Sequence, residues 1–261
     1  MARTPKHPSD PTDLGRNRTG TRSAPLRTKE MLENTAAVPG AMVDTSGLAM
    51  ARVELSEAAP PVGTMPPPGS VKGMAKAALE ALQGEKATVF LDKLGERLAF
   101  ERTGVRLYEA VLAKMPAAHL GKGSLSPDRV RRFRDEEQAH FRTVREAIEK
   151  LGGDPTALTP SADLAGVQAT GLVSVVTDPR TTLTQCLDAL LTAELADNDG
   201  WKLLIAMAEA MGQEDLASRF SRALAEEDQH LVSIRRWIAE RLEGQLGAKL
   251  PAPEFGVPPP A

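Results

Sequence analysis

The chain has 261 residues, of which 41% are hydrophobic but only 3% aromatic, and its formal net charge is −3 at pH 7. An apolar content dominated by alanine and leucine suits close helix packing rather than a sheet core, and the small acidic charge gives no attraction to nucleic acid or anionic membranes. We therefore expect an all-α protein that binds neither nucleic acid nor membranes.

Cysteine usage and the absence of targeting signals indicate a cytoplasmic location. Cys186 is the only cysteine, so no intrachain disulfide can form, and its apolar neighbours predict a small buried side chain. The basic N-terminal segment lacks the apolar run of a signal peptide, and nowhere do about 18 apolar residues run together as a membrane span requires. We expect the protein in the cytoplasm.

Residues 1–70 predict a disordered or extended arm. They lack helical periodicity and repeat proline, glycine, serine and threonine. Such a composition buries too little apolar surface to offset the entropy of ordering. Only Leu26–Asn34 is expected to form a short helix, against a partner surface. The basic segment that begins at Asn17 is either a recognition element for a partner or part of a solubilising linker.

Two helical hairpins are predicted within residues 71–243. A short helix over residues 71–82 precedes a long one over 86–115, which Pro116 ends. The sequence Ser-Pro-Asp from residue 126 supplies an N-cap, a proline at the first helical position and an early acid, so a second long helix should run over 126–151 to a Gly-Gly pair.

The connection over residues 154–180 is too long for a tight turn, because helix-to-helix joins usually take 2 to 8 residues. This connection should contain a short helix over 162–175. Two long helices are expected after it, over 181–211 and 214–242. The proline-rich tail over 244–261 is expected to be unstructured. The resulting order predicts a four-helix bundle with a long crossover between its second and third helices.

The first predicted hairpin carries a recognisable pattern of side chains. Glu101 precedes Tyr108 by seven residues, which is two helical turns. A Glu-x-x-His motif follows, with Glu137 36 residues after Glu101 and His140 one turn further on.

The second predicted hairpin repeats this pattern. Glu194 precedes Trp201 by seven residues, and a second Glu-x-x-His motif follows, with Glu227 33 residues after Glu194 and His230 one turn further on. Two of the chain's four histidines fall in these motifs. An acidic bundle without metal is the alternative, but the duplication favours a site built from all four long helices.

The chemistry of these side chains predicts two transition-metal ions. Iron(II) and manganese(II) prefer carboxylate oxygen with some imidazole nitrogen, and two neighbouring cations repel each other unless several carboxylates offset their charge. An i, i+3 spacing places each Glu-x-x-His pair on one helix face. We expect Glu137 and Glu227 to bridge the ions, Glu101 and Glu194 to bind terminally, and His140 and His230 to complete one ion each.

With these motifs the chain resembles the ferritin-like superfamily, especially rubrerythrin-type and bacterioferritin-type proteins, over about residues 86–243. The resemblance implies a di-iron centre, or less often a dimanganese centre, that reacts with dioxygen or peroxide. It also implies an additional ligand at Asp197, one turn after Glu194. The chain departs from rubrerythrins because it has no Cys-x-x-Cys pairs and so no rubredoxin-type iron centre.

Several neighbouring side chains have two interpretations each. Tyr108 and Trp201 are either core aromatics or hydrogen-bond donors that orient a ligand carboxylate. Glu136 and Glu226 precede the bridging candidates and point about 100° away around the helix. We expect these two acids to be solvated or paired with arginine.

Two functions follow as expectations. The first is oxidation of Fe(II) or scavenging of peroxide at a dinuclear centre, which would make the protein a ferroxidase or a peroxidase-like oxidoreductase. The second is a non-catalytic bundle that acts as a binding, cargo or structural module through its N-terminal arm. In either case we expect a homo-oligomer, a dimer or larger.

Overall fold

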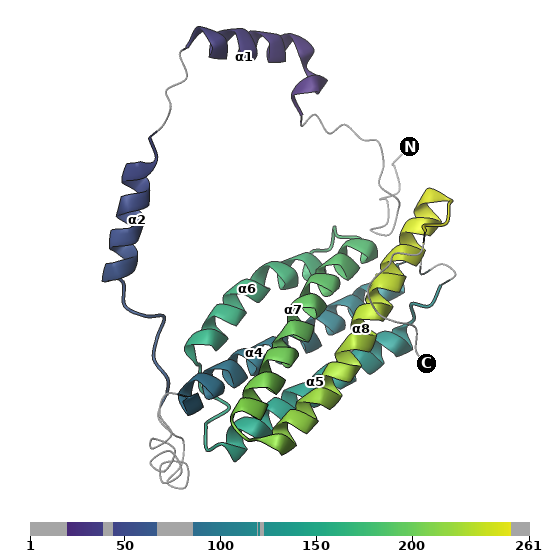
Figure 1. Ribbon diagram of the computed structural model, residues 1–261. Helices are drawn as coiled ribbons and strands as arrows, with labels where there is room; N and C mark the ends of the chain where they lie inside the picture. Colours follow the sequence, from purple (N-terminus) through teal and green to yellow (C-terminus); the bar gives the residue numbers. More distant parts are fainter. Residues whose placement is uncertain (1–19, 39–43, 67–85, 119, 121–122, 252–261) are drawn as a thin grey trace. The chain divides into compact units, whose positions relative to one another are not determined.

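A computed structural model gives the structure of the protein and describes residues 20–38, 44–66, 86–118, 120 and 123–251 (Figure 1). These residues form helices and no strands, so the predicted all-α class is confirmed. The helix predicted over residues 71–82 lies outside the described residues. The chain divides into two units, one within residues 11–61 and the other from residue 62 onward, and each is treated by itself.

The first unit contains helices that the sequence predicted only in part. A 3₁₀ turn, η1 (Thr21–Ser23), precedes α1 (Pro25–Ala37), which includes the short helix expected there. The second helix, α2 (Ser46–Ala58), lies where an extended chain was predicted. Its alanine, leucine, methionine, arginine and glutamate residues are good helix formers, but its apolar positions are spread around the helix and give no periodicity. Neither helix buries a residue.

The second unit contains all the predicted long helices. They are α4 (Lys86–Lys114), α5 (Pro127–Lys150), α7 (Leu183–Ala210) and α8 (Glu214–Leu246), with α6 (Pro160–Thr177) in the connection between α5 and α7. A 3₁₀ turn, η3 (Met115–Ala117), ends α4 at the proline that predicted its end. Each helix begins and ends within four residues of its predicted limits. The tail was expected to be unstructured from residue 244, but α8 continues to Leu246.

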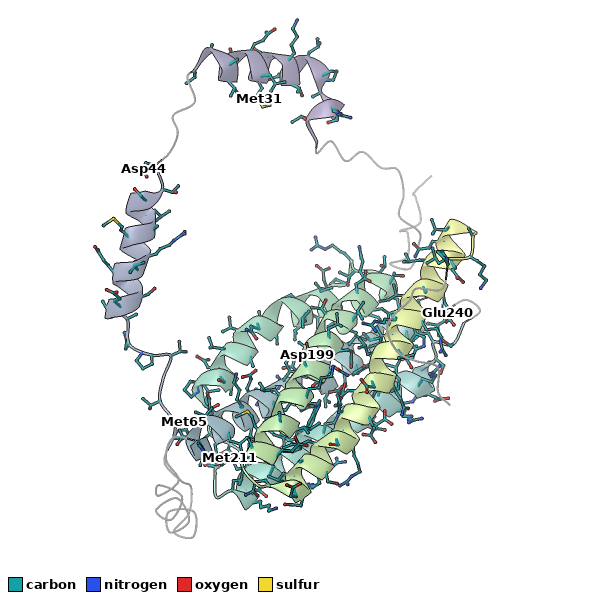
Figure 2. The ribbon with its side chains drawn as sticks, in the orientation of Figure 1. Met31, Asp44, Met65, Asp199, Met211 and Glu240 are labelled. Atoms are coloured by element: carbon teal, nitrogen blue, oxygen red, sulfur yellow. The ribbon has the colours of Figure 1, made fainter. Side chains whose placement is uncertain are left out.

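Local sequence signals explain where the long helices begin and end. The Ser126 side chain caps α5 by accepting from the Arg129 amide, and Pro127 occupies the first turn. Thr182 and Gln185 form a reciprocal capping box at the start of α7. Between α7 and α8 the chain turns at Gly212, whose φ of +66° favours glycine. Met211 lies at this turn (Figure 2).

Two apolar clusters fill the interior of the second unit. The Trp237 cluster includes Leu107, Tyr108, Phe133, Leu187, Leu190, Ile234 and Trp237. The Trp201 cluster includes Phe90, Leu94, Leu98, Val144, Trp201, Phe220 and Ala223. Buried Cys186 belongs to the Trp237 cluster, as its neighbours predicted. Among the described helices, none is long and apolar enough to cross a membrane.

The order of these clusters along each helix gives the helix directions. Along α4 and α8 the chain passes from the Trp201 cluster to the Trp237 cluster, whereas along α5 and α7 it passes the opposite way. Since α5 and α7 run in the same direction, the segment that connects them must run back along the length of the second unit. Helix α6 makes this return and packs on α4 and α7, while α4 contacts α5 and α7, and α8 contacts α5 and α7 (Figure 1).

We expect Thr182→Ala to lower the free energy of unfolding by about 1 kcal/mol, because it removes the cap of α7. The measurement is urea-induced unfolding followed by circular dichroism. Thr192→Ala is the matched control: its hydroxyl bonds the Asp188 carbonyl at 3.1 Å within the helix, so the change should stay within about 0.5 kcal/mol. Equal effects of the two substitutions would show that the capping box does not stabilise α7.

Candidate metal centre

Four carboxylates, one from each long helix, meet at the boundary between the two apolar clusters. Glu101 of α4, Glu137 of α5, Glu194 of α7 and Glu227 of α8 are each at most 2% exposed. Along every helix the glutamate lies between a turn of the Trp237 cluster and a turn of the Trp201 cluster. The apolar packing on both sides therefore holds the four acids at one level of the second unit.

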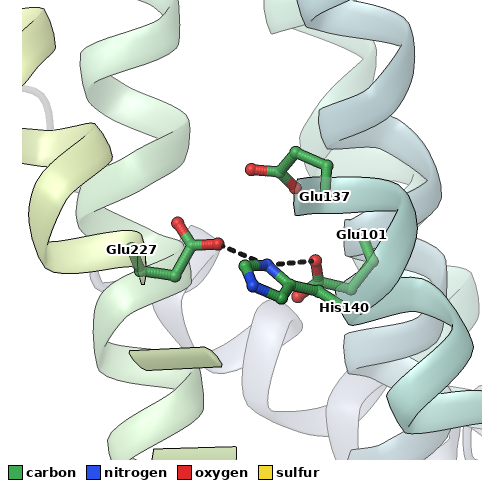
Figure 3. Close-up of side chains that lie close together, drawn as sticks. All are labelled: Glu101, Glu137, His140 and Glu227. Carbon is green, nitrogen blue, oxygen red and sulfur yellow. Dashed lines mark ion pairs between the residues drawn. The ribbon is translucent and has the colours of Figure 1, made fainter. Parts of the chain in front are cut away.

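The two histidines complete this group with their Nδ1 atoms directed inward. His140 Nδ1 lies 2.7 Å from Glu227 Oε1 and 3.7 Å from Glu101 Oε2 (Figure 3). His230 Nδ1 lies 3.3 Å from Glu227 Oε2 and 3.6 Å from Glu194 Oε2. Both rings are buried.

These six residues form two overlapping groups of potential ligands. One group contains Glu101, Glu137, His140 and Glu227, and the other contains Glu137, Glu194, Glu227 and His230; within each, the ligand atoms lie within 4.8 Å of one another. Ligands on opposite sides of one ion lie about 4.2 Å apart at bond lengths of about 2.1 Å. Glu137 and Glu227 belong to both groups, as bridging carboxylates must.

The donor set fits divalent cations because its inward atoms face one another and lack hydrogen bonds. No hydrogen bond within the described part of the chain satisfies Glu101 Oε2, Glu137 Oε2, His140 Nδ1, Glu194 Oε2, His230 Nδ1 or either carboxylate oxygen of Glu227. Buried polar atoms in such a state cost several kcal/mol unless a partner is supplied. A cation is the partner that several convergent oxygen and nitrogen lone pairs can share. The group can therefore hold a metal ion.

The outward Nε2 atoms of the histidines bond acids of the opposite motif. His140 Nε2 lies 2.8 Å from Glu226 Oε2, and His230 Nε2 lies 2.8 Å from Glu136 Oε2. Such bonds fix the ring so that Nδ1 faces the cluster. Glu136 also accepts from Arg132 at 2.7 Å, so pairing with arginine describes only half of its contacts. Pairing with arginine was predicted from each helix alone. Because α5 and α8 are in contact, Glu136 reaches His230 and Glu226 reaches His140.

The two aromatic residues have different contacts. The Tyr108 hydroxyl donates to Glu194 Oε1, so this side chain orients one carboxylate of the cluster. Trp201 instead packs edge-on against the His140 ring at 5.6 Å, and its indole Nε1 has no hydrogen-bond partner among the described residues. A role shared by both aromatics is therefore not found.

Asp197 belongs to neither ligand group. It is 2% exposed, and its Oδ1 lies 2.6 Å from Arg97 Nη1. Arg97 is itself 5% exposed and places its Nε 3.2 Å from Glu101 Oε1. Asp199, two residues further along α7, has an exposed side chain that pairs with Lys202 at 3.3 Å (Figure 2). Arg97 was absent from the sequence analysis, although its position four residues before Glu101 is the spacing of a helical ion pair.

Every buried acid of the described residues lies in this cluster. Four glutamates and Asp197 carry five negative charges when ionised, and within the described ranges Arg97 is the single buried residue with a permanent positive charge. Four negative charges remain, which two divalent cations would balance. This charge count does not depend on the ligand distances.

Burial and mutual repulsion act on the carboxylates while no cation is present. Burial, followed by the charges of the neighbouring acids, holds the pKa of Glu101, Glu137 and Glu227 well above the usual range. Burial would also raise the pKa of Glu194, but the nearby His230 ring and the Tyr108 hydroxyl bring it below its ordinary value. For His230, burial opposes the charged form, yet the hydrogen bond with Glu136 and the nearby Glu137 carboxylate hold its pKa well above the usual range. The cluster therefore takes up protons when it lacks metal.

Two glycines make room for the charged side chains. A Cβ at Gly104 would lie 2.2 Å from Glu137 Oε2, and a Cβ at Gly200 would lie 2.2 Å from Arg97 Nη1. Gly104 is one turn after Glu101, in the position that Asp197 occupies after Glu194. A side chain at Gly104 would thus displace a bridging candidate.

Comparisons of the chain with protein-family models, with curated proteins and with solved structures found no significant match.

We expect Gly104→Ala to remove one of two bound metal ions, because the added methyl group displaces the Glu137 carboxylate. Elemental analysis of protein loaded anaerobically with Fe(II) measures the stoichiometry. Gly166→Ala is the control, since a Cβ there meets no atom within 4 Å, and it should leave the metal content unchanged. Full metal content in Gly104→Ala would show that Glu137 tolerates the shift.

Proposed function

We propose that the protein is a ferritin-like, dinuclear metal protein whose iron or manganese ions react with dioxygen or peroxide. The single observation that carries the proposal is the pair of overlapping buried ligand groups that share Glu137 and Glu227. An acidic surface patch would be solvated, whereas these ligand atoms are buried and converge.

The arrangement of the helices supports a ferritin-like bundle. Such bundles supply one glutamate from each of two helices and a Glu-x-x-His motif from each of the other two. Here α4 and α7 supply the single glutamates, and α5 and α8 supply the motifs. The parallel course of α5 and α7, joined through α6, supports the proposal, because ferritin-like bundles have one long crossover and simple up-and-down bundles have short loops throughout.

The composition of the ligand set supports iron or manganese. Four carboxylates with two imidazoles suit these ions, whereas structural zinc sites use more thiolate and imidazole, and calcium takes oxygen ligands alone. A bound Fe(II) pair would supply the two electrons that, with two protons, reduce one peroxide molecule to water.

The chain's own residues would prepare the site for this chemistry. Tyr108 holds Glu194 by one oxygen and leaves the other oxygen directed at the cluster. Glu136 and Glu226 fix the orientation of the histidine rings from outside. The two apolar clusters exclude water on either side, which strengthens the electrostatic attraction between ligands and cations.

We expect the purified protein to bind two equivalents of Fe(II) or Mn(II), and Glu137→Ala to bind no more than one because a bridging ligand is lost. Anaerobic titration followed by elemental analysis gives both numbers. Glu209→Ala, at an exposed position of α7, serves as the matched control and should keep both ions. A wild-type protein that gains no metal would overturn the proposal.

We expect the Fe(II)-loaded protein to be oxidised by dioxygen or by peroxide at least about tenfold faster than Fe(II) in the same buffer. Stopped-flow absorbance with each oxidant separately measures the rates, and the faster oxidant distinguishes Fe(II) oxidation from peroxide scavenging. If two ions bind but neither oxidant reacts faster than in buffer, the redox part of the proposal fails while the metal site stands.

A second candidate function is partner binding through the N-terminal arm. Helices α1 and α2 have 13 residues each and bury none, and they expose Leu26, Leu32, Leu48, Val53 and Leu55. Isolated helices of this length are marginal in water, so a partner surface would stabilise them. Removing residues 1–61 should then change the oligomeric mass or abolish capture of a partner. Unchanged mass in light scattering, together with unchanged partners, would exclude this candidate.

A further inference from the structure

Arg97 lies between α4 and α7 with its guanidinium inside the cluster of acids. Its Nε lies 3.2 Å from Glu101 Oε1, and its Nη1 lies 2.6 Å from Asp197 Oδ1. The same Nη1 donates to the Asp197 carbonyl oxygen at 3.0 Å. The Arg97 side chain therefore contacts both the outer oxygen of Glu101 and the buried Asp197, which belongs to neither ligand group.

The fold makes specific provision for this cation. The absence of a side chain at Gly200 leaves the space that Nη1 fills, and the guanidinium carbon lies 4.3 Å from the centroid of the Phe100 ring. A buried arginine costs several kcal/mol unless its partners are well placed. These contacts indicate that the surroundings of residue 97 fit a guanidinium group specifically.

Among the described residues, the other half of the site has no buried arginine or lysine. The residue four positions before Glu194 is Leu190, which is fully buried in the Trp237 cluster. The outer oxygen of Glu194 accepts from the neutral hydroxyl of Tyr108 instead. The outer oxygens of the two terminal carboxylates thus have different partners: a guanidinium at Glu101 and a neutral hydroxyl group at Glu194.

We propose that Arg97 is a positioning residue that makes the two metal positions unequal, so that an ion binds first and more tightly beside Glu194 and His230, and second and more weakly beside Glu101 and His140. This inference rests on the proposed dinuclear function. A guanidinium on one carboxylate oxygen reduces the negative charge available at the other oxygen, and it repels a nearby cation. A hydroxyl group does both to a much smaller extent.

The test is anaerobic titration with Co(II), in which calorimetry measures the heat of binding. We expect the wild-type protein to bind two ions with Kd values at least about tenfold apart. His140→Ala should keep only the tighter ion, and His230→Ala only the weaker one, which assigns each Kd to its position. Two ions with equal Kd values would overturn the inference and leave the dinuclear function intact, whereas fewer than two ions would overturn both.

The decisive variant is the double substitution Arg97→Met with Asp197→Asn. It removes one positive and one negative charge together, so the net charge of the cluster is unchanged while Glu101 loses its cationic partner. The weaker Kd should decrease at least about fivefold and the tighter one should change less than twofold. Equal changes at both positions, or no change, would contradict the inference.

Two further measurements keep the test decisive. Circular dichroism establishes that each variant is folded, and Arg129→Gln, which removes a guanidinium packed over Trp237 away from the ligands, should leave both Kd values unchanged. If the double variant does not fold, Asp197→Asn alone replaces it. That change leaves the guanidinium to Glu101, so the ratio of the two Kd values should widen. A ratio that narrows or stays constant would count against Arg97.

Discussion

The mutual repulsion of four buried glutamates is the constraint on which the rest of this structure depends. Two unit charges 4 Å apart repel by about 4 kcal/mol at an effective dielectric constant of 20, and each carboxylate here has several such neighbours. Within each of the two groups that share Glu137 and Glu227, the ligand atoms lie within 4.8 Å of one another inside an apolar interior. Protons or cations must therefore compensate this charge. Two apolar clusters, one on each side, provide the packing that keeps the acids together in spite of it.

The compensation extends outward through bonds between helices. Each histidine of one Glu-x-x-His motif is held by the acid that precedes the other motif's glutamate, so α5 and α8 are joined twice at the level of the site. Tyr108 of α4 holds Glu194 of α7, and Arg97 of α4 holds Asp197 of α7. Since these bonds join different helices, the contacts that orient the ligands also set how the helices pack. Ligand orientation and helix packing therefore depend on the same residues.

The ligand candidates could be predicted from the sequence because helical periodicity fixes which residues share a face. An i, i+3 spacing brings Glu137 and His140 together whatever surrounds the helix, and the repeated pattern identified the other three helices. The contacts of Glu136 and Glu226 could not be predicted in this way. Their direction on their own helix is known from the sequence, but the residue that meets them belongs to a neighbouring helix. The helix α2 was missed for a different reason. Its residues have high helix propensity, but the prediction relied on the periodicity of apolar residues, which is weak in α2.

The duplicated pattern is symmetric in its ligands but not in the residues around them, and the structure gives a physical reason. A carboxylate in place of Gly104, the counterpart of Asp197, would collide with Glu137, because even a Cβ there would lie 2.2 Å from its Oε2. An additional acid in the α4 half would thus require Glu137 to move, whereas the α7 half holds Asp197. That acid is buried without a metal contact, and so it requires a cation of its own. Arg97 provides it and contacts Glu101 at the same time, so the proposed inequality of the two metal positions would follow from where one glycine and one aspartate stand.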